Sequence, residues 1–182
     1  ARRMAYSVIP EVRLPAQARV VSCEEFGHSV RENKLLTPDG KILMTQFLAL
    51  MLAGECPLLY GPETQDFLAI AESLISSGRS IRLVADPTMI SSGDLWVRAG
   101  NHLATPLYQG LLLSESSYPR TILAVIERVE CSAARFWLPA LKDQLHGGDF
   151  PRCFMICGTI ENEDCEEAEK MKEKHIRLKV EN

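Results

Sequence analysis

Three segments of the sequence carry residues that could bind or act on a ligand, and each directly follows an apolar run. Gly61 follows the run CPLLY, Glu127 follows RTILAVI, and Thr159 follows CFMICG. Continuous apolar runs of this length are typical of buried parallel strands, and ligands of parallel sheets bind beyond the carboxyl ends of the strands. A glycine turn can approach phosphate, a carboxylate can orient water, and a hydroxyl can hydrogen-bond an anion.

Other kinds of site are not supported by the spacing of histidine, cysteine and serine. Cys153 and Cys157 form a C-x3-C pair without a second pair, and the histidines at 28, 102, 146 and 175 are scattered, so we predict no metal site. A hydrolase nucleophile has no G-x-S-x-G turn to carry it. We interpret the six cysteines as reduced thiols in a cytoplasmic or nuclear compartment, mostly beside apolar runs: 23, 56, 131, 153, 157 and 165.

The charge balance argues against broad, non-specific binding of nucleic acid. The 182 residues include 20 Lys and Arg and 24 Asp and Glu, a net charge of −4, whereas nucleic-acid binding favours a basic face. The arginines near the N-terminus could still form a local basic patch: Arg2, Arg3, Arg13 and Arg19. The charge-rich stretch 161–174 predicts a solvated helix with pairs such as Glu166–Lys170.

The sequence also predicts an intracellular protein that is part of a longer chain. No apolar run approaches the roughly 18–20 residues of a transmembrane helix, and the N-terminus lacks the apolar core of a signal peptide. The opening residues, Ala1-Arg2-Arg3-Met4, are typical of an arbitrary start within a longer protein.

Hydrophobic patterning predicts strands that alternate with helices. We expect strands at 56–60, 80–85, 120–126, 153–158 and 175–180, with a further short candidate at 18–22. We expect helices at 44–53, 64–76, 92–96, 105–112, 132–146 and 163–172, with Pro139 kinking or splitting the fifth. Residues 29–41 are polar and are expected to form a loop, with Pro38-Asp39-Gly40 as a turn.

This alternation predicts an α/β protein with three layers, α/β/α, around a mainly parallel sheet. We divide the chain into an N-terminal arm or linker at 1–40 and one α/β domain at 41–182.

The order of these segments resembles the core of an AAA+ P-loop ATPase, of the branch that includes restriction-motor, dynein and midasin modules. The run from Leu58 to Leu68 resembles the strand, loop and helix of a Walker A motif, and 120–128 resembles a Walker B strand with Glu127 at the catalytic carboxylate. Residues 154–162 resemble a sensor strand, with Thr159 and Asn162 as its polar residues. The resemblance covers about 44–182 and implies a core without its C-terminal lid subdomain.

The residues that would bind nucleotide depart from the family pattern. The vestigial loop corresponds to Gly61, Pro62, Glu63, Thr64, Gln65, Asp66, Phe67 and Leu68. In this alignment Asp66 stands at the second glycine, Phe67 at the lysine and Leu68 at the Ser/Thr that binds Mg²⁺, while Ile126 replaces the Walker B metal ligand. The carboxylate would repel phosphate, and the apolar side chains can supply neither a cation nor a metal ligand.

The resemblance therefore implies a catalytically inactive, pseudo-ATPase domain without a cofactor. It would act as a scaffold or a protein-interaction module, alone or in an oligomer, with protein partners or other domains of the same chain. Its candidate surfaces are the 1–40 segment and the loop at 96–102. Neither a membrane nor directly bound nucleic acid is expected.

Two other hypotheses stay open. An ATPase subunit could have its site completed by a neighbouring subunit, with ATP and Mg²⁺ bound and Glu127 orienting the attacking water. Alternatively, the chain could be a flavodoxin-like α/β regulatory domain, which would need an acidic cluster at its strand ends.

Overall fold

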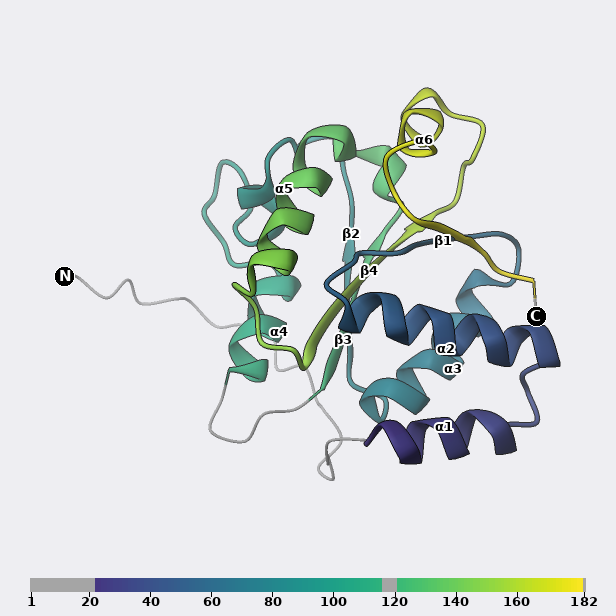
Figure 1. The fold of residues 1–182 in the computed structure, drawn as a ribbon. Coiled ribbons are helices and arrows are strands. Elements are labelled where there is room, and N and C mark those ends of the chain that lie inside the picture. The colour runs from purple at the N-terminus through teal and green to yellow at the C-terminus, as the bar shows by residue number, and fades with distance from the viewer. Residues whose placement is uncertain (1–21, 116–120, 182) are drawn as a thin grey trace.

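A computed structural model describes residues 22–115 and 121–181, and it confirms the three-layer α/β fold (Figure 1). The strand candidate at 18–22 lies almost wholly outside the described residues. The elements follow in the order α1 (Cys23–Glu32), α2 (Pro38–Leu52), β1 (Leu58–Tyr60), α3 (Thr64–Ser76), β2 (Ser80–Val84), η1 (Ser92–Leu95), α4 (Pro106–Ser114), β3 (Ile122–Glu127), η2 (Val129–Cys131), α5 (Ala134–Gly147), β4 (Phe154–Ile160), α6 (Glu166–Met171) and β5 (Arg177–Lys179).

The five strands form one sheet in the order β2-β3-β4-β1-β5, and every pairing is parallel. This order is typical of the AAA+ core. A flavodoxin-like sheet has the order 2-1-3-4-5, so the flavodoxin-like hypothesis is wrong. All five strands predicted at 56–60, 80–85, 120–126, 153–158 and 175–180 are present, each within two residues of its expected start.

Alternating side chains of β3 show how the sheet carries two apolar cores. Leu123 and Val125 face the core formed with α1, α2 and α3, whereas Ile122, Ala124 and Ile126 face the core formed with α4, α5 and α6. In Figure 1 the first group of helices lies below and to the right of the sheet, and α4 and α5 lie on its left. Burial on both faces explains why the strands are apolar without alternation.

The loop expected at 29–41 is confirmed only for residues 33–37, because α1 extends to Glu32 and α2 begins at Pro38. Ser22 and Glu25 form a capping box that starts α1. The hydroxyl of Thr37 accepts the N–H of Gly40, and Pro38 occupies the first turn, so the expected turn is the start of α2. Residues 23–40, assigned above to an arm, therefore include α1, whose Phe26 and Val30 are buried in the core beside α2 and α3.

Two further features complete the fold. Pro139 does not split the predicted helix, since α5 continues to Gly147. Within the described residues, no helix is both long and apolar enough to cross a bilayer.

Candidate functional site

A cavity of about 760 Å³ lies beyond the carboxyl ends of β1, β2, β3 and β4, and we call it the strand-end cavity. Its lining residues are Gly61, Pro62, Thr64, Gln65, Val84, Glu127, Arg128, Thr159, Ile160, Glu161 and Glu163. The fold thus brings together parts of the three segments singled out in the sequence, as parallel strands require. Five of the predicted site residues are not among its lining residues: Glu63, Asp66, Phe67, Leu68 and Asn162.

The turn between β1 and α3 is short, because α3 already begins at Thr64. Gly61 has a φ of +112°, and a Cβ placed on it would lie 2.8 Å from the carbonyl oxygen of Val180, which follows β5. The hydroxyl and the N–H of Thr64 both donate to the carbonyl of Gly61, at 2.8 and 3.3 Å. The connection between β1 and α3 therefore consists of residues 61–63 alone.

Because α3 begins at Thr64, the last residues aligned above with a Walker A motif lie within the helix. Phe67 and Leu68 are fully buried, and the rings of Phe67 and Phe47 pack edge-on with their centroids 5.7 Å apart. Both side chains pack into the core with α2, away from the strand-end cavity. Asp66 is exposed on the first turn of α3. The position aligned with the lysine thus stabilises the core.

At the end of β3, Glu127 is held by an arginine on the neighbouring edge strand. Arg82 Nη1 lies 2.6 Å from Glu127 Oε1 and also donates to Gln65 at 2.8 Å, while Nη2 lies 2.6 Å from Glu72 on α3. Burial lowers the pKa of Arg82, but its hydrogen bonds to Glu127 and Glu72 outweigh burial and raise that pKa above the usual value. Ile126, at the aligned metal-ligand position, is fully buried.

The two sensor-like residues at the end of β4 make hydrogen bonds within the fold. The buried hydroxyl of Thr159 accepts the backbone N–H of Arg128 at 3.1 Å, and Arg128 has a left-handed φ of +57°. Asn162 is exposed, and its Oδ1 accepts the N–H of Asp164 at 3.2 Å. The N–H groups of Glu161 and Asn162 both donate to the buried carboxylate of Glu130 at 2.9 Å.

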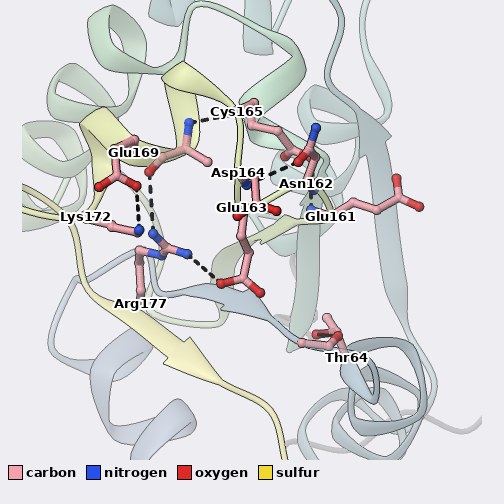
Figure 2. A network of polar contacts seen from close by, with 12 residues as sticks. Thr64, Glu161, Asn162, Glu163, Asp164, Cys165, Glu169, Lys172 and Arg177 are labelled. Atoms are coloured by element: carbon pink, nitrogen blue, oxygen red, sulfur yellow. Dashed lines mark hydrogen bonds and ion pairs between the residues drawn. The ribbon is translucent and has the colours of Figure 1, made fainter.

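Two more arginine–glutamate pairs join the cavity to the loop between β4 and α6. Arg128 Nε lies 3.0 Å from Glu161 Oε2, and Arg177 Nη2 on β5 lies 3.2 Å from Glu163 Oε2. Figure 2 shows the second pair, with the Glu163 carboxylate directed toward Arg177. Among the described residues that line the cavity, Glu127, Glu161 and Glu163 each have an arginine partner.

These arginines are the part of the site that sequence reasoning missed. The charge pattern of the stretch 161–174 predicts a solvated helix. That interpretation is right for α6, where Glu166 pairs with Lys170. It is wrong for residues 161–163, since these form a loop whose carboxylates reach back to β3 and β5.

Metal and thiol chemistry find no support in the described part of the chain. No cluster of three His, Cys, Asp or Glu side chains within it could hold a metal ion. All six cysteines are free thiols. Burial raises the pKa of Cys56 to about 12 and that of Cys157 well above its usual value, so both thiols stay protonated at neutral pH.

Comparisons with known proteins add solved structures of low sequence identity. No protein-family model and no curated protein matches the sequence. A candidate ATPase from Cytophaga hutchinsonii matches with a TM-score of 0.47 and 13% identity, over 87% of this chain and 50% of that one. PCH-2 of C. elegans matches with a TM-score of 0.47 and 18% identity, over 93% of this chain and 50% of that one. This chain therefore spans about half the length of the solved structures it matches.

Proposed function

We propose that this chain is an AAA+-like pseudo-ATPase domain, which does not hydrolyse ATP and acts as a scaffold or protein-interaction module. Its partners would be other proteins or other domains of a longer chain. The proposal rests on where the residues aligned with a Walker A motif lie in the fold. Phe67 and Leu68 are core residues of α3, and the turn at 61–63 is shorter than the loop expected of a Walker A motif.

The electrostatics of the strand-end cavity support the same proposal. A phosphate site needs cations that are free to neutralise the ligand. Here Arg128 is the one cationic residue among the described lining residues, and it is paired with Glu161. An incoming triphosphate would meet three carboxylates, and like charges repel at such short range.

The remaining alternative is an ATPase whose missing cations come from a neighbouring subunit. In that case Glu127 would orient the attacking water. The geometry disfavours this role, because Glu127 already accepts a hydrogen bond from Arg82 at 2.6 Å. One of its carboxylate oxygens is therefore already engaged by a guanidinium and is not free to orient a water.

Two exposed apolar side chains support an interaction role. Val84, at the end of the edge strand β2, is 51% exposed, and Leu103, on the loop before α4, is 50% exposed. Trp96, in contrast, is partly buried and packs its ring on Phe150 and Phe154, so it belongs to the core. The proposed contact surface therefore consists of residues 97–102, without Trp96.

Calorimetric titration with ATP, ADP and GTP, each with and without Mg²⁺, tests the proposal. We expect no binding up to several hundred micromolar nucleotide. Micromolar binding would overturn the proposal and favour a completed site. The Glu127→Gln variant then separates the two functions, because only the ATPase alternative expects it to abolish a measurable turnover.

A further inference from the structure

We propose that the strand-end cavity is a latent oligophosphate site that two glutamates of its own chain, Glu161 and Glu163, keep closed. The inference deepens the proposed function and rests on it, because it explains why the native domain would not bind nucleotide. It assigns a role to the β4–α6 loop: its carboxylates take the places at two arginines that phosphate oxygens would otherwise occupy.

Arg128 is the cation that this site would offer first. Its side chain lines the cavity and is 53% exposed, and Glu161, which is 72% exposed, binds it at 3.0 Å. Its backbone is fixed by the hydrogen bond from its N–H to Thr159. A guanidinium in this position can bind phosphate through two parallel N–H groups once its carboxylate partner is removed.

Arg177 provides a second, more buried positive charge behind Glu163. Its side chain is 8% exposed, its guanidinium stacks on the ring of Tyr60 at 4.5 Å, and it contacts the carbonyl of Ala168. Its Nε is buried without a hydrogen-bond partner. Figure 2 shows Glu163 on the side of Arg177 that faces Thr64, a cavity-lining residue. Glu163 therefore stands between this arginine and the cavity.

The loop that carries the two carboxylates is held in place at its start. Glu130 is buried and accepts the N–H groups of Glu161 and Asn162, both at 2.9 Å. A carboxylate tethered in this way competes at a high effective concentration, which for short links reaches the millimolar range. A free oligophosphate at lower concentration is thus excluded by competition for Arg128 and by repulsion from Glu127, Glu161 and Glu163.

The test compares the native chain with the Glu161→Gln/Glu163→Gln double variant in calorimetric titrations with sodium pyrophosphate and tripolyphosphate. The matched control is Glu166→Gln/Glu169→Gln, which removes the same charge from the α6 pairs with Lys170 and Lys172, outside the cavity. A third variant adds Arg128→Gln to the first. A parallel titration with Mg-ATP shows whether the nucleoside contributes.

We expect the cavity double variant to bind tripolyphosphate at least tenfold more tightly than the native chain and the α6 control, and Arg128→Gln to remove that gain. Equal binding by the cavity and α6 variants, or a gain that survives loss of Arg128, would overturn the inference. If the double variant does not fold, Glu161→Gln alone decides, because this exposed side chain is dispensable for packing.

The two proposals fail in different ways. If neither the native chain nor the cavity double variant binds pyrophosphate, tripolyphosphate or Mg-ATP, the latent-site proposal is overturned. The pseudo-ATPase proposal is then unaffected. Micromolar Mg-ATP binding by the native chain would overturn the pseudo-ATPase proposal, whatever the variants do.

Discussion

Arg82 on the edge strand β2 and Glu127 at the end of β3 are joined by an ion pair of 2.6 Å, although they lie 45 residues apart in the sequence. The same guanidinium binds Glu72 on α3 at 2.6 Å. One side chain thus connects two strands and a helix at the rim of the strand-end cavity, and it pairs with Glu127, the residue aligned above with a catalytic carboxylate.

Removing this arginine should destabilise the fold. We expect Arg82→Met to lower the free energy of unfolding by about 1–3 kcal/mol, because two partly buried carboxylates lose their partner. Urea denaturation measures the change. The matched control is Lys172→Met, which breaks an exposed pair with Glu169 and should cost less than about 0.5 kcal/mol. Equal costs for the two variants would contradict a central role for Arg82.

Two glycines should respond in opposite directions to the same substitution. Gly61 has a φ of +112°, and an added Cβ would lie 2.8 Å from the carbonyl oxygen of Val180, so Gly61→Ala should cost at least about 1 kcal/mol. Gly27 lies inside α1 with no atom within 4 Å of an added Cβ, so Gly27→Ala should stabilise by about 0.5–1 kcal/mol. Thermal unfolding measures both. A harmless Gly61→Ala would show that the turn before α3 is not constrained by β5.

The hydroxyl of Thr159 should matter for structure. Thr159→Val keeps the shape but removes the acceptor for the N–H of Arg128, and we expect it to lower the free energy of unfolding by about 1–3 kcal/mol. Amide hydrogen exchange at Arg128 should accelerate in this variant and stay slow in Thr159→Ser, which retains the hydroxyl. Unchanged exchange in Thr159→Val would rule out this hydrogen bond.

The ion pairs of Glu55 should make stability depend on pH. Burial raises the pKa of Glu55, but the hydrogen bond and charge of Lys142, together with His146, outweigh it and bring the pKa below its usual value. A carboxyl group with a lowered pKa in the folded state stabilises the protein above its unfolded pKa, about 4.3. This contribution is lost as the pH falls through the lower, folded pKa.

Urea denaturation at several pH values between 7 and 3 measures this effect. We expect Glu55→Gln to be less stable than the native chain at pH 7, with the difference shrinking as the pH falls below about 4.3. The control is Glu173→Gln, at an exposed position, which should leave the profile unchanged. A difference that is constant with pH would show that the loss comes from packing and not from charge.

The secondary structure shows which signals the sequence makes readable. The strands around Leu58, Leu123 and Ile156 are predicted closely, because strands buried on both faces give continuous apolar runs bounded by turns. The start of α2 at Pro38 was missed, although Thr37 before it is a cap residue. The residues Pro38-Asp39-Gly40 of its first turn are also typical of a turn, and the prediction followed that pattern and not the cap.

The candidate site was predictable only in part. That Gly61, Glu127 and Thr159 share one edge follows from parallel strands, whose carboxyl ends point the same way. The arginine partners were not predictable, because each pair joins side chains from separate elements. Arg82 and Glu127 lie 45 residues apart, and no local pattern in the sequence marks their pairing.

By itself, the sequence determined the α/β class and the approximate strands, since these depend on local composition and periodicity. Only the tertiary structure decided the order of the strands, the early start of α3 that buries Phe67, and the pairing of Arg82, Arg128 and Arg177 with glutamates. The physical reason is that ion pairing depends on distances of a few ångströms between side chains, and packing of the whole chain sets those distances.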